Sequence, residues 1–205
     1  MYTNWFFLIG FNGSGINQLS SPHGLALDST NGILFISDTD NHRIIKRILN
    51  SSNCSVTAGG NGPGISSNQL YGPRGIFFDA KSMSLFIANT KANNIVRWPL
   101  NGYSWTLVGG DPGGQVGSSS FQLNFPTSVL LDSMDNVYVS DEKNHRVQFF
   151  LAGQLNASTI AGVTGINGIT AQSLYSPVGV VIDANLNLYV CEFVNVRVQK
   201  FNFML

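Results

Sequence analysis

Short apolar runs separated by Gly, Asn, Asp and Ser make up most of the chain, and no run shows a sustained helical period. Four of these runs begin next to a proline and end at an aspartate. They read SPHGLALD, GPRGIFFD, FPTSVLLD and SPVGVVID, and they recur about every 50 residues. This internal repeat predicts that the chain is an array of similar units.

Further apolar runs follow, three in each of units one to three and two in unit four. The second runs are ILFISD, SLFIAN, NVYVSD and NLYVCE, and the last runs include CSVTAGG, SWTLVGG and STIAGV. β-Branched and aromatic residues bounded by turn-forming residues indicate strands. The first strand of each unit is apolar on both faces, so we expect it to be buried on both. Four-stranded sheets repeated at this period predict an all-β fold, the β-propeller, with the first strands around its axis.

The fourth unit ends without a fourth strand, whereas residues 3–9 have the pattern of one. We therefore expect the N-terminal strand to pair with the third strand of unit four and complete a four-bladed ring. The alternative is an open arc of a six-bladed propeller. On either arrangement we expect one domain over residues 1–205, with repeats at about 19–59, 70–109, 123–162 and 174–205, plus 3–10.

The third strand of each unit is preceded by a short polar motif. It reads Asn41-His42-Arg43, Ala92-Asn93-Asn94, Asn144-His145-Arg146 and Asn195-Val196-Arg197. Together with the Pro-x-Gly-apolar-Asp run, this order resembles NHL repeats over essentially the whole chain. The resemblance implies a propeller that is usually a protein-interaction module and sometimes binds RNA. A minority branch of similar fold contains peptidylglycine-amidating lyases.

An acidic residue precedes an arginine by five positions in three of the units. A hairpin with a four-residue loop places such residues opposite each other, so we interpret them as structural pairs rather than as a catalytic set. The predicted pairs are Asp38 with Arg43, Asn89 with Asn94, Asp141 with Arg146, and Glu192 with Arg197. In unit two both charges are replaced by amides together.

The resemblance to amidating lyases implies zinc held by histidines from several blades. A catalytic zinc site needs three protein ligands, but only His23 has a suitable first-strand position. The other histidines, His42 and His145, share one repeat position and are interpreted as turn residues. The sequence thus predicts no catalytic, metal or cofactor site. A propeller enzyme with an axial metal, lyase-like or lactonase-like, is the alternative function.

The long loops between units and the hairpin loops fall on the same face of the predicted propeller. We expect this face to bind a protein or peptide partner, because its residues are mixed in charge and partly apolar. The candidates are His23, Thr39, Arg74, Lys91, Thr127, Glu142 and Phe193. The predicted function is a non-catalytic interaction scaffold, which would also suit one part of a larger multidomain protein.

The charge composition limits the classes of partner that we expect the protein to bind. Lys and Arg total 11, Asp and Glu also total 11, and no basic cluster occurs. This argues against nucleic acid, and an RNA-binding NHL domain remains the second alternative. No apolar run is long enough for membrane insertion. Sequons at Asn12, Asn50, Asn53 and Asn156 are compatible with an extracellular location but about as frequent as chance predicts, so the compartment is unassigned.

Overall fold

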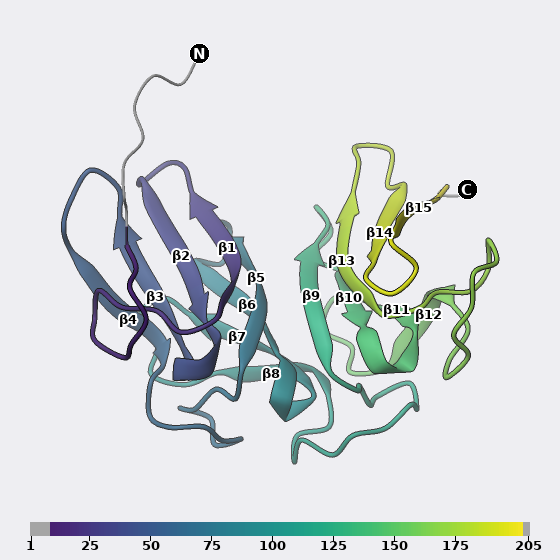
Figure 1. Cartoon of the computed structure of the whole chain (residues 1–205), viewed down its shortest axis with the longest axis horizontal. Helices are drawn as coiled ribbons and strands as arrows, with labels where there is room; N and C mark the ends of the chain where they lie inside the picture. The colour runs from purple at the N-terminus through teal and green to yellow at the C-terminus, as the bar shows by residue number, and fades with distance from the viewer. Residues whose placement is uncertain (1–8, 203–205) are drawn as a thin grey trace.

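The computed structural model describes residues 9–202 and consists of β-strands joined by turns and loops (Figure 1). Three single-turn 3-10 helices, Thr39–Asn41, Thr90–Ala92 and Glu142–Asn144, lie in hairpins. The strands are β1 (Pro22–Asp28), β2 (Ile33–Asp38), β3 (Arg43–Ile48), β4 (Cys54–Gly59), β5 (Pro73–Asp79), β6 (Ser84–Asn89), β7 (Asn94–Pro99), β8 (Thr106–Gly110), β9 (Pro126–Leu131), β10 (Val137–Asp141), β11 (Arg146–Phe150), β12 (Ala157–Gly162), β13 (Pro177–Ile182), β14 (Leu188–Glu192) and β15 (Arg197–Phe201).

The strands form four antiparallel sheets, each of which is one blade. Blades one to three are the meanders β1–β4, β5–β8 and β9–β12, and blade four is the three-stranded sheet β13–β15. The predicted all-β fold with four propeller blades is confirmed.

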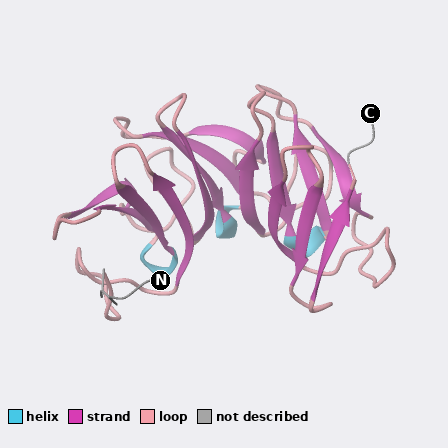
Figure 2. Cartoon of the chain, turned by 90° about the horizontal axis from the view of Figure 1, so that it is seen from above, coloured by secondary structure: helices cyan, strands magenta, loops and turns pink. Residues whose placement is uncertain are grey.

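The blades follow one another around an arc. Their first strands pack in sequence, β1 on β5, β5 on β9, and β9 on β13. Figure 2 shows the first and last blades at the two ends of the arc, and β1 and β13 make no extensive contact. The strand predicted over residues 3–9 lies outside the described residues, apart from Ile9, which is in a bend. The described blades form an open arc, and completion of blade four by residues 3–9 stays a prediction.

Three apolar clusters form the core, and each lies between neighbouring blades. The cluster between blades one and two contains Phe35 and Ile44 from the first blade and Ile87 from the second. Each cluster also takes in a fully buried leucine from the linker between the blades: Leu70, Leu123 or Leu174. The linkers are therefore part of the core.

The expectation that every first strand is buried on both faces is wrong at the ends of the arc. β9, with neighbours on both sides, is buried almost throughout. In β1, by contrast, Leu25 and Leu27 are exposed, as is Val181 in β13. Burial of these strands comes from adjacent blades, and blades one and four each have only one.

Candidate protein-binding face

The candidate site is the linker face, made by the three 3-10 hairpins, the hairpin loop of residues 193–196 and the loops of residues 10–21, 60–72, 111–125 and 163–176. Within each hairpin, the acidic and basic side chains meet. Arg43 Nε lies 2.7 Å from Asp38 Oδ2, and Arg146 Nε lies 2.7 Å from Asp141 Oδ2. The pair in blade four, Arg197 with Glu192, is 2.6 Å apart. In blade two, Asn89 Nδ2 donates to Asn94 Oδ1 at 3.1 Å.

The terminal nitrogens of each guanidinium donate hydrogen bonds to the linker that precedes the same blade. Arg146 donates to the carbonyl oxygens of Ser118 at 2.8 Å, Ser119 at 3.0 Å and Gln122 at 2.9 Å. Arg43 makes the same kind of contact with Gly15 and Gln18. Charge-assisted hydrogen bonds of this kind are among the strongest that side chains make. The arginine therefore connects its hairpin to the linker. We call the arginine, its acidic partner and their contacts with the linker a clamp.

The asparagine of the NHL motif belongs to the same clamp. Asn144 Nδ2 donates to Asp141 Oδ2 and to the carbonyl oxygen of Gly117, both at 2.8 Å. Asn41 and Asn195 do the same in their own blades. Sequence reasoning missed this role, although the recurrence of Asn three residues after the acid was the signal for it.

The pKa of the acidic residue shifts in opposite directions in blades three and four. Burial raises the pKa of the Asp141 carboxyl, against the lowering effect of donors on Asn124, Asn144 and Arg146. Burial also acts to raise the pKa of Glu192, but the donors on Arg197, Tyr175, Gln199 and Asn195 outweigh it, so that this pKa is lowered. The four donors around Glu192 prevail over burial, whereas the three donors around Asp141 do not.

Blade two lacks the arginine and uses a different donor. The indole Nε1 of Trp105 donates to the carbonyl oxygen of Gln69 at 2.8 Å. By repeat position, Gln69 corresponds to Gln18 and Gln122, whose carbonyls accept from the arginines. An indole N–H thus replaces a guanidinium at the same carbonyl.

The histidines of the motif connect neighbouring blades. His42 and His145 have φ of 55° and 56°, and Asn93 occupies the same position with φ of 54°. His42 Nδ1 accepts from the Gly72 N–H at 3.1 Å, and His145 Nδ1 accepts from the Ser176 N–H at 3.3 Å. Asn93 Oδ1 accepts from the Phe125 N–H at 3.0 Å. These residues are in turns, but sequence reasoning missed the contact between blades.

Both histidines are biased toward the neutral form that can accept this bond. Burial is the main cause that lowers the pKa of His42, and Lys91 lowers it further. Burial and Lys143 have the same effects on the pKa of His145. A neutral imidazole has one acceptor nitrogen, whereas the protonated ring has none.

Three of the seven candidate binding residues are buried between blades. Thr39 Oγ1 donates to the Pro73 carbonyl oxygen at 2.6 Å, and Thr127 Oγ1 donates to the Pro177 carbonyl oxygen at 3.3 Å. Glu142 Oε1 accepts from Ser176 Oγ at 3.2 Å. These three side chains connect neighbouring blades and offer little surface to a partner.

The other four candidates are accessible. His23 Nδ1 lies 3.2 Å from Thr39 Oγ1, and Arg74 Nη1 lies 3.9 Å from Glu142 Oε2. Lys91 Nζ lies 3.7 Å from Asp40 Oδ1. Phe193 is 73% exposed in the hairpin loop of blade four.

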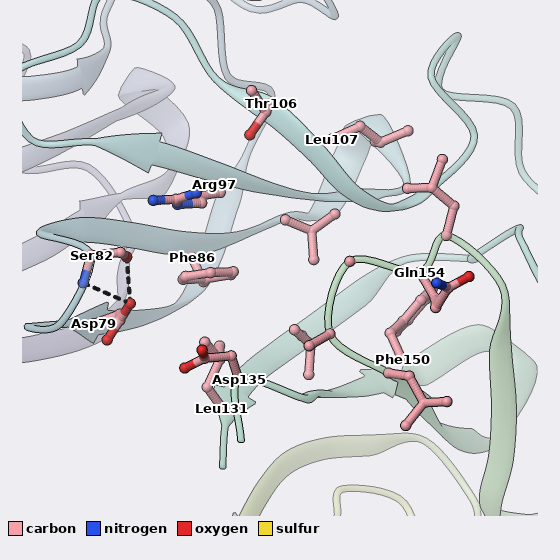
Figure 3. Close-up of a pocket in the computed structure, with 16 residues that line it drawn as sticks. Asp79, Ser82, Phe86, Arg97, Thr106, Leu107, Leu131, Asp135, Phe150 and Gln154 are labelled. Carbon is pink, nitrogen blue, oxygen red and sulfur yellow. Dashed lines mark hydrogen bonds between the residues drawn. The ribbon is translucent and has the colours of Figure 1, made fainter. Parts of the chain in front are cut away.

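Two cavities bear on binding. One, of about 310 Å³, lies along the first strands and is lined by His23, Arg74, Thr127 and Ser128, among others. The other, of about 370 Å³, lies between blades two and three (Figure 3). Phe86, Leu131 and Phe150 supply its apolar lining, while Arg97 and Asp135 are polar. Sequence reasoning missed this cavity, because its lining comes from strands and turns of two different repeats.

Residues 9–202 contain no side-chain cluster suited to a metal ion and no membrane-spanning helix. No three His, Cys, Asp or Glu side chains there are grouped so as to hold a metal ion. None of the helices in that range is long and apolar enough to cross a membrane.

Comparison with known families identifies the repeats that carry these contacts. A family description of the NHL repeat matches residues 19–46, 123–150 and 174–201. The chain therefore contains NHL repeats. Each matched segment begins at the linker leucine and ends in the third strand of its blade. The NHL repeat of blade two is unmatched, and there Asn89, Asn93 and Asn94 replace the acid, the histidine and the arginine.

Solved structures share the fold. A protein of unknown function from Bacteroides thetaiotaomicron matches with a TM-score of 0.72 at 15% identity over 87% of this chain and 46% of that one. A gluconolactonase from Xanthomonas campestris gives 0.69 at 15% identity over 91% and 60%. The nidogen/laminin complex gives 0.66 at 20% identity over 90% and 60%. The chain spans about half to three fifths of these proteins. No curated protein matches the chain.

Proposed function

We propose that this NHL-repeat protein is a non-catalytic scaffold that binds a protein or peptide through its linker face. The observation that carries the proposal is the engagement of the polar motif residues. Asn144 and Arg146 donate to the Asp141 carboxylate and to linker carbonyls, and the clamps of blades one and four repeat this pattern. These side chains are hydrogen-bonded to one another and to the linker backbone, so their positions and their N–H groups are already engaged. They are therefore poor candidates for acid–base chemistry.

The accessible residues of the linker face suit a polypeptide partner. Phe193 offers an exposed aromatic ring, and Arg74 and Lys91 offer cations beside carboxylates. Aromatic residues and arginine are enriched in protein interfaces. The nidogen/laminin complex, one of the similar solved structures, supports protein binding as a role for this architecture.

Site-specific photo-crosslinking tests the proposal. A benzophenone amino acid is placed at Phe193 and, as the control, at Tyr103, which is 91% exposed in the turn between β7 and β8 at the opposite ends of the strands. In an extract of cells that make the protein, we expect a discrete crosslinked polypeptide from position 193 and none from position 103.

Direct binding then uses the identified polypeptide in purified form. We expect the charge reversals Arg74→Glu and Lys91→Glu to weaken its binding at least tenfold, and Lys81→Glu, on a turn at the opposite ends of the strands, to leave it unchanged. The same crosslinked species from both positions, or affinity insensitive to Arg74 and Lys91, would contradict the proposal.

A further inference from the structure

The cavity between blades two and three is built entirely from the described part of the chain. Every residue of its lining falls between Asp79 and Leu155, and both blades contribute strands and turns to it (Figure 3). The turns that contribute, such as the one between β11 and β12, lie at the ends of the strands opposite the linker face. The cavity is therefore separate from the proposed protein-binding face.

Much of the lining is apolar. Phe86, Leu131 and Phe150 are 8%, 8% and 1% exposed, whereas Leu151 and Leu155 lie in a turn and are 57% and 50% exposed. The volume of about 370 Å³ is within the range of small-molecule sites, which are mostly apolar and contain a few polar groups. The cavity can thus enclose the apolar body of a ligand.

Arg97 brings a positive charge to this lining. Its side chain is half-buried, and its Nε donates to Ser84 Oγ at 3.1 Å. Among residues 9–202, the terminal nitrogens of Arg97 have no hydrogen-bond acceptor, and no carboxylate oxygen lies within 4.0 Å of them. This guanidinium differs from those of the clamps, whose nitrogens all serve the hairpin or the linker.

Two carboxylates also line the cavity, and both already have donors. Asp79 accepts from the Lys81 and Ser82 N–H groups, both at 3.1 Å, and from the Ser82 hydroxyl. Asp135 Oδ2 lies 2.7 Å from Lys81 Nζ. The guanidinium of Arg97 is consequently the charged group of this lining that has no ionic or hydrogen-bonded partner for its terminal nitrogens within the described residues.

We propose that this cavity binds a small carboxylic acid with an apolar body, such as a medium-chain fatty acid. The strand register supports this, because Arg97 pairs with Thr106 on one side and with Phe86 on the other. Cross-strand partners lie on the same face of a sheet, so a hydroxyl, a guanidinium and a phenyl ring stand in one row. The ligand carboxylate accepts from Arg97, which can donate two parallel bonds, and the apolar body packs over Phe86.

The neighbouring blades show why a cation alone is not enough. Lys46 is the counterpart of Arg97 in blade one, since it pairs with Phe35 as Arg97 pairs with Phe86. It lines a different cavity, of about 490 Å³, which is richer in hydroxyl and amide side chains. In blade three the counterpart is Phe149, which carries no charge. Lys46 therefore provides a matched control for Arg97.

Calorimetric titration of the full chain with octanoate, hexanoate and octanol tests the site. We expect one-to-one binding of octanoate, roughly tenfold weaker binding of hexanoate because two fewer methylenes are buried, and at least tenfold weaker binding of octanol. Arg97→Gln should weaken octanoate binding at least tenfold and leave octanol binding unchanged, because only octanoate carries the carboxylate. Lys46→Gln should bind both probes as the original protein does.

Two further variants keep the test decisive if Arg97→Gln fails to fold. Leu151→Asp adds a negative charge at an exposed position of the lining and should also weaken octanoate binding at least tenfold. Asp135→Asn removes a negative charge and should tighten octanoate binding, and asparagine tolerates the φ of 65° found there. Absent or unsaturable octanoate binding, equal affinity for octanol, a folded Arg97→Gln protein with unchanged affinity, or weaker binding by Asp135→Asn would each overturn the proposal.

Discussion

Arg146 and Asp141 form a buried ion pair, with Nε 2.7 Å from Oδ2, at the centre of the third hairpin. The same guanidinium holds three carbonyl oxygens of the preceding linker. One side chain thus connects the second strand, the third strand and the linker of its blade. The consequence is that hairpin and linker should lose their structure together when this arginine is removed.

Replacing Arg146 by Met should lower the free energy of unfolding by about 3–5 kcal/mol, because the Asp141 carboxylate would stay buried without its partner. The measurement is urea-induced unfolding. The matched variant is Arg197→Met, whose side chain is 28% exposed, so that solvent can replace part of the lost interaction and the loss should be smaller. Equal losses for the two variants would contradict this account of burial.

Truncating a linker leucine should be costly only where two blades enclose it. Leu123→Ala removes a fully buried side chain between blades two and three, so we expect it to cost about 2–5 kcal/mol. Leu19→Ala removes the half-buried counterpart in the first linker and should cost less than half as much. Thermal unfolding of both variants at low protein concentration gives the comparison.

At the interblade histidine position, asparagine should substitute for His42 and alanine should not. Asn93 already accepts the equivalent bond in blade two, and asparagine tolerates positive φ. Alanine would leave the Gly72 N–H without its acceptor at a cost of about 1–3 kcal/mol. The control, Val196→Ala, changes the same repeat position in blade four, where the described residues include no following blade. A His42→Ala protein as stable as its Asn variant would refute this role.

Acid should weaken the contacts that His42 and His145 make. Burial lowers the pKa of both rings below the ordinary value of 6.5, so the unfolded chain binds protons at a higher pH than the folded protein. Stability from the neutral rings is therefore complete above about pH 6.5 and is lost as the pH falls through the folded pKa values. The free energy of unfolding should fall from pH 7 to pH 5, and the fall should be shallower in the His42→Asn, His145→Asn double variant.

Trp105→Phe should loosen one linker. The change keeps an aromatic ring but removes the indole donor to the Gln69 carbonyl, a hydrogen bond with a net value of about 1 kcal/mol. Hydrogen exchange should become faster at the Gly64 and Gln69 amides, which donate within residues 60–72. The corresponding Gln18 amide of the first linker is the internal control. Unchanged exchange at Gln69 would show that another contact holds this linker.

Much of the fold was predictable because strand patterns and tight turns are local. The proline-to-aspartate runs and the apolar runs after them predicted the strands and their order within each blade. The five-residue spacing of Asp38 and Arg43 follows from the hairpin loop, so these residues could be paired from the sequence alone. The candidate binding face was less predictable, since Thr39, Thr127 and Glu142 lie between blades. Packing between blades involves residues from two repeats, so the pattern within one repeat does not predict it.

The sequence by itself determined a fourfold repeat of β-hairpins, the polar motif at each turn and the leucine in each linker. Only the tertiary structure decided what those residues contact: His42 reaches the next blade, Arg43 holds the linker of its own blade, and Trp105 acts in place of an arginine. It also decided that the described blades form an open arc. The physical reason is that hydrogen bonding within a blade depends on neighbours in sequence, whereas the path of the arc depends on how whole sheets pack against one another.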